Sequence, residues 1–290
     1  MTGFSLTAPA KLNLFLHITG RREDGYHTLQ TLFALLDTGD QLDFAPSDDL
    51  LLDAPAPLDT EDNLVLRAAR ALKAASGYAG GAHLTLHKRL PAGGGVGGGS
   101  SDAATTLLGL NRLWQLGLSR DQLAHIGLSL GADVPVFVHG HSAWAEGVGE
   151  QLTPVSLPEQ LYLVVNPAVS VPTAQIFGDR QLTRDTPKSR LAAFLEPGSA
   201  SQFGNDCEPV ARRLFPAVAD ALDWLDEHAG NARMTGTGAC VFARIASRTT
   251  GEKLLAQLPE RWTGFVACSV DHSPALDELE ALEALQATTS

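Results

Sequence analysis

The chain has 290 residues, of which 44% are hydrophobic and 19% are charged, and its formal net charge is −12. This length fits one large domain or two modest ones, and the hydrophobic content is typical of a globular protein and excludes a disordered chain. The acidic balance and the lack of a lysine- or arginine-rich cluster argue against nucleic acid or an anionic membrane as the main partner.

The first predicted element is a strand over residues 5–18, where apolar and other side chains alternate. Alternation with period two indicates a half-buried strand, and it places Lys11 and Asn13 on the same face. On this pattern alone, Lys11 is a solvated lysine at the start of a strand. The turn that follows, RREDGYH, sets the rings of Tyr26 and His27 side by side, which suits stacking on a base or a sugar as well as packing of the turn on its neighbour.

The next segments predict three strands and two helices. Residues 28–37 and 41–44 have strand patterns, and residues 63–76 have the pattern of an amphipathic helix. Residues 83–87 alternate again like a strand, and residues 100–114 predict a helix whose leucines cluster on one side.

The connection between the last of these strands and the last of these helices is the glycine-rich sequence PAGGGVGGGSSDAA, residues 91–104. Glycine permits φ > 0 and has no Cβ, so consecutive N–H groups of such a loop can converge on one point. A helix that starts directly after the loop adds its own free N–H groups and its dipole, and this arrangement binds anions. The sequence therefore predicts a cradle for phosphate. Its residues are Pro91, Ala92, Gly93, Gly94, Gly95, Val96, Gly97, Gly98, Gly99, Ser100 and Ser101.

Three other interpretations of this loop are weaker. A Walker A loop needs a lysine where this sequence has Ser100. The dinucleotide fingerprint is matched by Gly93, Gly95 and Gly98, but the acidic residue that it needs about 20 residues further on, at the end of a second strand, falls in a predicted helix and turn. A flexible linker seldom opens directly into a helix rich in alanine and leucine.

Asp133 lies at a predicted tight corner. A helix over residues 120–130 ends at Gly131, and the aspartate follows in the sequence GADVPVF. Taken alone, it is a capping or turn aspartate. His139 and His141 come two residues apart, but nothing else of metal-ligand spacing lies near them, so we expect surface histidines rather than a metal pair.

The proline-containing stretch over residues 154–158 interrupts the pattern and predicts a boundary between two domains, residues 1–156 and residues 157–290. Beyond it, Thr173 is a plausible cap of the helix that begins there. Residues 178–203 are polar and irregular, and we expect them to be the most mobile segment.

The second domain carries a further glycine-bearing feature. In MTGTGACVF, residues 234–242, Gly236 and Gly238 precede an apolar strand, which indicates a backbone that another segment approaches closely. Residues 205–229 before it predict one long helix with an apolar stripe toward the core. The chain is predicted to end in an acidic helix from Leu276.

The three cysteines, Cys207, Cys240 and Cys268, are far apart and odd in number, which predicts buried free thiols in a reducing compartment rather than a disulfide framework or a zinc site. The start of the chain lacks the pattern of a signal peptide, and no apolar run approaches the roughly 18 residues of a membrane span. We therefore expect a cytoplasmic protein.

Three segments, in this order, resemble the signature motifs of one enzyme family, the GHMP kinases (galacto-, homoserine, mevalonate and phosphomevalonate kinases). The segments are PAKLNLFLHI with DGYH, then PAGGGVGGGSSDAA, then MTGTGACVF, and GADVPVF and AEGVGE extend the resemblance from residue 8 to about residue 270. In detail they are similar to those members that phosphorylate a cytidine diphosphate-linked methylerythritol. A glycine loop alone is weak evidence, whereas this ordered set is highly specific.

The resemblance implies an α+β fold of two domains, an N-terminal ribosomal-protein-S5-like α/β domain and a C-terminal ferredoxin-like domain, with the site in the cleft between them. It implies ATP as the phosphate donor, Mg²⁺ as the accompanying ion, and the tertiary C2 hydroxyl of a small-molecule substrate of the non-mevalonate isoprenoid pathway as the acceptor. By motif position, Asp133 is the catalytic base, Lys11 is its partner, and the loop over residues 91–101 holds the ATP phosphates. The residues implied to bind the substrate are Asn13, Tyr26, His27, Thr173 and Phe177.

The chemistry agrees with these roles. A tertiary alcohol is a poor nucleophile, so a carboxylate within reach can take its proton, and a nearby lysine would favour the ionised carboxylate. Asp102 departs from the asparagine expected after the two serines, and its charge is unfavourable unless it points away from the phosphates or assists Mg²⁺. Ser100 and Ser101 are alternative Mg²⁺ contacts, and no metal site is fixed by protein side chains.

Several alternatives stay open on the sequence. They are another small-molecule GHMP kinase, a non-catalytic nucleotide-binding module on the same scaffold and, more remotely, a dehydrogenase. Both a monomer and a homodimer are compatible with the sequence.

Overall fold

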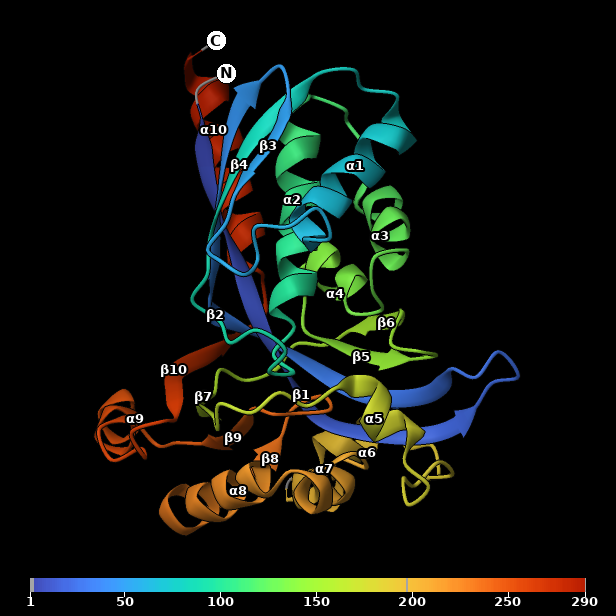
Figure 1. The fold of residues 1–290 in the computed structure, drawn as a ribbon, viewed down its shortest axis with the longest axis vertical. Helices are drawn as coiled ribbons and strands as arrows, with labels where there is room; N and C mark the ends of the chain where they lie inside the picture. Colours follow the sequence, from blue (N-terminus) through green and yellow to red (C-terminus); the bar gives the residue numbers. More distant parts are fainter. Residues whose placement is uncertain (1–2, 197, 290) are drawn as a thin grey trace.

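The structure, a computed structural model, describes residues 3–196 and 198–289. Its longest elements are two antiparallel strands, β1 (Phe4–Arg21) and β2 (His27–Ser47). Both strands run through the upper and the lower part of the molecule in Figure 1, so a single hairpin contributes to both parts.

The prediction of two short strands in place of β2 is wrong, because the chain stays extended through Gly39. A Cβ at this position would lie 2.1 Å from the backbone oxygen of Ala8 on β1. Glycine therefore allows the two strands to remain paired where another residue would force them apart.

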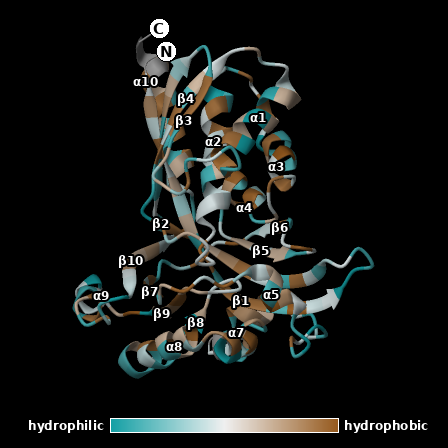
Figure 2. Cartoon of the chain, in the orientation of Figure 1, coloured by the Kyte–Doolittle hydropathy of each residue, from teal (hydrophilic) through white to brown (hydrophobic). Residues whose placement is uncertain are grey.

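In the upper part, helices cover one face of the sheet that contains β2 (Figure 1). Figure 2 shows hydrophobic residues gathered between these helices and the sheet, with hydrophilic residues on the outer surfaces. The other strands are β3 (Leu50–Asp53), β4 (Gly81–His87), β5 (Ala143–Glu146) and β6 (Gln151–Pro154). The helices are α1 (Leu64–Ser76), α2 (Gly98–Leu113), α3 (Arg120–Leu128) and α4 (Val134–His139).

In the lower part, an antiparallel sheet has helices of the second half of the chain on its outer side (Figure 1). Its strands are β7 (Leu161–Asn166), β8 (Arg233–Met234), β9 (Val241–Arg244) and β10 (Thr263–Val270). The accompanying helices are α5 (Thr173–Gly178), α6 (Leu191–Leu195), a 3₁₀ turn (Ser199–Gln202), α7 (Glu208–Leu214), α8 (Pro216–Ala229) and α9 (Arg248–Leu255).

Two details of this half differ from the prediction. The single helix expected over residues 205–229 is two helices, because Pro216 cannot donate a backbone hydrogen bond and instead starts α8. The segment expected to be irregular over residues 178–203 contains α6 and the 3₁₀ turn, and residue 197 within it lies outside the described residues.

The two parts share strands and helices. The last residues of β10 pair with β2, through Ser269 opposite Leu36 and Val270 opposite Leu35, so the two sheets are continuous. Leu16 of β1 packs in the core of the lower part, whereas α10 (Pro274–Thr289) returns to β1 in the upper part. The division at residues 156 and 157 stays a prediction.

β1 is buried on both faces, which corrects the expectation of a half-buried strand. The successive residues Leu12 and Asn13, whose side chains alternate between the two faces of a strand, are 0% and 3% exposed. Lys11 is only 2% exposed, so it is not a solvated lysine. Within the described residues, no helix is both long and apolar enough to cross a membrane.

Candidate active site

A pocket of about 930 Å³ lies where the glycine loop, the β1–β2 turn, α5 and the loop before β9 meet. This volume is within the range of small-molecule sites. All five residues predicted to bind the substrate line it, as do Lys11 and Asp133. Of the predicted phosphate cradle, Gly93–Gly95 and Gly97–Ser100 line the pocket, Val96 and Ser101 are buried, and Pro91 and Ala92 lie outside the lining.

The glycine loop adopts backbone angles that favour glycine. Gly93, Gly95 and Gly97 have φ values of +67°, +79° and +76°. A Cβ on Gly95 would lie 2.3 Å from the backbone oxygen of Thr235, and one on Gly97 would lie 2.7 Å from the ring of Phe137. No larger residue fits between these neighbours without displacing them.

The start of α2 leaves donors free for an anion. Its N-cap is Gly97, which has no side chain to accept from the N–H groups of the first turn. These N–H groups and the positive end of the helix dipole adjoin the pocket, since Gly98, Gly99 and Ser100 line it.

Backbone hydrogen bonds hold the loop on two sides. The Lys11 N–H of β1 donates to the Val96 carbonyl at 2.9 Å, and the Cys240 N–H donates to the Gly94 carbonyl at 3.0 Å. The loop is therefore fixed between the first strand of the chain and the segment before β9.

Lys11 and Asp133 lie together at the wall of the pocket. Lys11 Nζ is 3.3 Å from Asp133 Oδ2, and it donates to Asn13 Oδ1 at 2.5 Å and to the Gly95 carbonyl at 3.1 Å. It also lies 5.2 Å above the ring of Phe33. The buried ammonium is thus surrounded by oxygen acceptors and a ring face, which offset the loss of water.

Asp133 does not act as a helix cap. It occupies the N-cap position of α4, but its side chain accepts no hydrogen bond from that helix, and 34% of the side chain is exposed. The corner GADVP therefore directs a carboxylate into the pocket beside the ammonium of Lys11.

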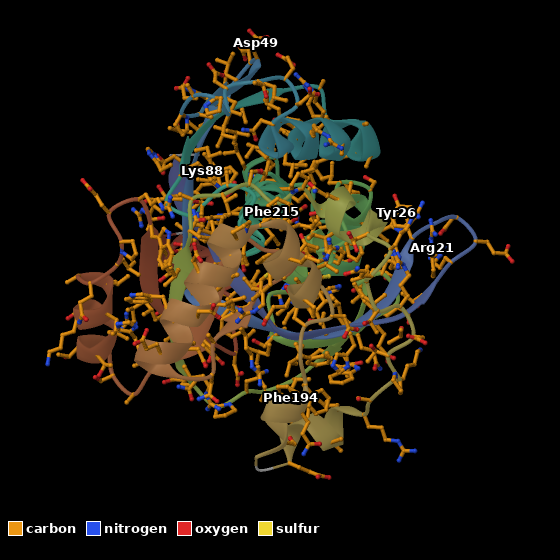
Figure 3. All side chains as sticks on the ribbon, turned by 60° about the horizontal axis from the view of Figure 1, so that its bottom comes forward. Arg21, Tyr26, Asp49, Lys88, Phe194 and Phe215 are labelled. Atoms are coloured by element: carbon orange, nitrogen blue, oxygen red, sulfur yellow. The ribbon has the colours of Figure 1, made fainter. Side chains whose placement is uncertain are left out.

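The far end of the pocket is aromatic. The rings of His27 and Phe177 are stacked with centroids 5.0 Å apart, and Tyr26 is 67% exposed at the rim. Figure 3 shows Tyr26 and Arg21 at one end of the molecule, well away from Lys88. Burial, and then the charges of Arg184 and Arg21, hold the pKa of His27 below its usual value of 6.5, so its neutral form is favoured.

Thr173 lines the pocket but does not cap α5. The N-cap of α5 is Pro172, and the predicted cap role of Thr173 is wrong. The Thr173 hydroxyl instead hydrogen-bonds the Thr237 hydroxyl at 3.0 Å, which links α5 to the loop before β9.

Asp102 lies beside the predicted phosphate cradle but does not line the pocket. Its carboxylate is buried, and it accepts a hydrogen bond from Lys88 Nζ at 2.9 Å. Lys88 also donates to Asp40, whose other oxygen accepts from the Arg89 and Leu90 N–H groups at 2.6 and 2.8 Å. Burial raises the pKa of Asp102 to about 7, with the charge of Asp40 adding to the rise and that of Lys88 opposing it.

Two buried residues that support the pocket lining were not predicted from the sequence. Thr235 accepts from the Asn13 N–H at 3.0 Å and donates to the Gly95 carbonyl at 3.1 Å, so it joins all three motifs. Asn205 donates to the carbonyls of Met234 and Gly236 at 2.9 and 2.8 Å. Thr235 lay within a recognised motif, but Asn205 followed an irregular stretch that has no periodic signal.

The two histidines considered as a metal pair are not brought into a cluster. The His141 ring lies 5.1 Å from the His272 ring at a tilt of 53°, and within residues 3–196 and 198–289 no group of three or more His, Cys, Asp or Glu side chains gathers as metal ligands. Cys207 and Cys240 are free and buried, as predicted, and Cys268 is free and partly exposed.

Comparison with known proteins identifies the family. The family description "GHMP kinases N terminal domain" matches residues 63–141, and "GHMP kinases C terminal" matches residues 184–264. The chain is 62% identical over 276 residues to a 4-diphosphocytidyl-2-C-methyl-D-erythritol kinase of Alcanivorax borkumensis, with 93% of this chain and 92% of that protein covered. It is 52% identical over 287 residues to the protein of the same name in Hahella chejuensis, with 95% and 96% covered.

A solved structure agrees with these relatives. The crystal structure of a 4-(cytidine 5'-diphospho)-2C-methyl-D-erythritol kinase superimposes with a TM-score of 0.80 at 33% identity, covering 92% of this chain and 100% of that one. The predicted α+β fold of two GHMP kinase domains and the prediction of a small-molecule kinase are both confirmed. The chain therefore belongs to the GHMP kinases and, within them, to the family of the 4-diphosphocytidyl-2-C-methyl-D-erythritol kinases.

Proposed function

We propose that the protein transfers the γ-phosphoryl group of ATP to the C2 hydroxyl of 4-diphosphocytidyl-2-C-methyl-D-erythritol, a step of the non-mevalonate route to isopentenyl diphosphate. The observation that carries the proposal is the pairing of Lys11 Nζ with Asp133 Oδ2 at 3.3 Å in the pocket that the glycine loop lines. The names of the relatives supply the identity of the substrate.

The glycine loop and the first turn of α2 receive the phosphates. Their N–H groups are fixed before the ligand arrives, so little reorganisation is needed as negative charge moves during transfer. The loop supplies this stabilisation through the backbone, which suits a protein whose net charge is −12.

Asp133 acts as the base. Its carboxylate takes the proton of the C2 hydroxyl while the hydroxyl oxygen forms a bond to the γ-phosphorus, and the bond from that phosphorus to the β-phosphate oxygen breaks to release ADP. The ammonium of Lys11 lies 3.3 Å from this carboxylate and is held in place by its hydrogen bonds to Asn13 and Gly95.

Ser100 is the contact that we propose for Mg²⁺. Its side chain lines the pocket beside the loop, whereas Ser101 is fully buried. A hydroxyl oxygen is a suitable ligand for Mg²⁺ beside phosphate oxygens, and the bound ion would neutralise phosphate charge.

The aromatic end receives the cytidine group. Tyr26 and Phe177 offer ring faces to the base and His27 lies beside them, while Asn13 and Thr173 offer polar atoms nearer the reacting hydroxyl. We further propose a cytoplasmic protein, either a monomer or a homodimer, with domains divided at residues 156 and 157, and with no nucleic-acid partner.

The proposal is tested by following ADP release with ATP, Mg²⁺ and 4-diphosphocytidyl-2-C-methyl-D-erythritol. Asp133→Asn should lower kcat by about 10²–10⁴-fold because the general base is lost. Asp220→Asn, an exposed aspartate on α8 outside the pocket, is the matched control and should leave kcat unchanged. Turnover that survives in Asp133→Asn would overturn the mechanism, and turnover of homoserine or mevalonate instead would overturn the substrate.

A further inference from the structure

The guanidinium of Arg184 joins the two walls of the aromatic end of the pocket. Its Nη2 donates to the carbonyls of Phe177 and Asp179 at 2.9 and 2.7 Å, at the end of α5, and its Nη1 donates to the Leu182 carbonyl at 2.9 Å. Its Nε donates to His27 Nε2 at 3.0 Å, and His27 belongs to the first half of the chain. One half-buried side chain therefore joins the end of α5 to the start of β2.

The bond to His27 determines where the imidazole carries its proton. An arginine only donates hydrogen bonds, so His27 Nε2 must be the unprotonated nitrogen that accepts. A protonated imidazolium has no acceptor and cannot make this bond. His27 is therefore neutral, with its proton on Nδ1.

The direction of this Nδ1–H group is also fixed. The His27 ring stacks on Phe177 with an interplanar angle of 19°, and the bond to Arg184 prevents the ring from turning in its plane. His27 lines the pocket, and no hydrogen bond joins Nδ1 to the protein within the described residues. Nδ1–H is thus the donor of this fixed ring that remains for a ligand.

We infer that Arg184 is a positioning residue which, by fixing this tautomer of His27, makes the site select cytosine over uracil. The inference rests on the proposed function, because it takes the nucleobase to bind at the aromatic end. Cytosine presents an acceptor at N3, whereas uracil presents an N3–H donor at the same position. A fixed Nδ1–H donor can hydrogen-bond to N3 of cytosine, but it faces another donor at N3–H of uracil. A site with such a donor therefore discriminates strongly between the two bases.

Without Arg184, His27 is free to move its proton to Nε2 and present an acceptor at Nδ1. The preference for cytosine should then fall. If Arg184 served only to anchor the end of α5, its removal would weaken the binding of both bases by the same factor, so the ratio of the two affinities separates the two roles.

The experiment measures the Kd of CDP and of UDP by calorimetry. In Arg184→Met, we expect the preference for CDP over UDP to fall by about tenfold or more, while the KM for ATP stays within twofold. Arg213→Met is the matched control, because Arg213 bonds the side chain of Asp179 in the same segment and does not touch His27. It should keep the wild-type preference.

A double-mutant cycle shows whether the effect passes through His27. In a His27→Phe background, which keeps a ring but has no tautomer, Arg184→Met should not change the ratio further. An equal fall in the preference in both backgrounds would overturn the inference. Arg184→Lys, which retains a charge but not the fork of donors, should behave like Arg184→Met.

The tautomer itself is observable in the wild-type protein by histidine ¹H–¹⁵N correlation spectra, with the His27 signal assigned by its loss in His27→Phe. A protonated Nδ1 and an unprotonated Nε2 are expected, and a proton on Nε2 would overturn the inference whatever substrate the enzyme accepts. If the spectrum agrees but 4-diphosphocytidyl-2-C-methyl-D-erythritol is not phosphorylated, the proposed function fails and the tautomer assignment stands.

Discussion

At the scale of single residues, Asp102 is a buried acidic side chain next to the proposed phosphate cradle. It lies just after the first turn of α2, and its carboxylate pairs with Lys88 beside Asp40, outside the pocket lining. The cluster nevertheless contains two carboxylates and one ammonium in a buried place. One of the carboxylates must therefore be costly to ionise, which is why the pKa of Asp102 is raised to about 7.

This raised pKa predicts how stability depends on pH. The unfolded chain releases the Asp102 proton near pH 4, whereas the folded chain holds it until about pH 7, so folding loses stability as pH rises through this window. Asp102→Asn has no such proton. Its stability relative to wild type should therefore increase between pH 5 and pH 7, by at most about 1.4 kcal/mol for each pH unit. Urea unfolding of both proteins at pH 5, 6, 7 and 8 measures this difference, and a difference that is constant with pH would contradict the assignment.

At the scale of elements, the conformation of the glycine loop depends on its contacts with distant segments of the chain. Gly95 lies against the Thr235 carbonyl, and both belong to motifs that are 140 residues apart in the chain. Gly95→Ala places a Cβ 2.3 Å from that oxygen at a φ of +79°, so the loop must move. We expect a loss of about 10²-fold in kcat/KM, since a shift of about 1 Å in positioning groups has this effect.

Gly77→Ala is the control for Gly95→Ala, because it introduces a similar backbone strain without displacing the glycine loop. Gly77 ends α1 at a φ of +70°, a Cβ at this position would meet no atom within 4 Å, and the residue is not part of the pocket. The substitution should cost about 1 kcal/mol of stability and leave kcat/KM unchanged. Equal activity of the two variants would show that the contact with Thr235 does not position the loop.

The sequence predicted the elements whose signals are local. The glycine loop, the helix after it and the corner at Asp133 were recognisable, because glycine and helix-ending patterns act over a few residues. The burial of Lys11 was not recognisable from alternation, because it depends on Asp133, Gly95 and Phe33, which come from distant segments. Arg184 and Asn205 were missed for the same reason: each acts through carbonyls or a ring whose position only the folded chain determines.

At the scale of the whole molecule, the end of the chain stabilises its beginning. α10 packs along β1 in the upper part, and the end of α10 lies close to the start of β1 in Figure 1. Leu276 and Leu279 of α10 belong to the same core as Leu6, and Glu278 accepts hydrogen bonds from both the backbone and the hydroxyl of Thr7. Residues of the predicted second domain therefore contribute to the core of the first.

Leu276→Ala tests this arrangement. The side chain is 2% exposed and packs against Gly140, so its removal should leave a cavity and lower the free energy of unfolding by about 2–5 kcal/mol. Because α10 does not line the pocket, the KM values for both substrates should stay within twofold of wild type. Leu285→Ala, on the same helix but 64% exposed, should change stability by no more than about 0.5 kcal/mol. If Leu276→Ala left the free energy of unfolding unchanged, α10 would not contribute to the stability of the core in the upper part.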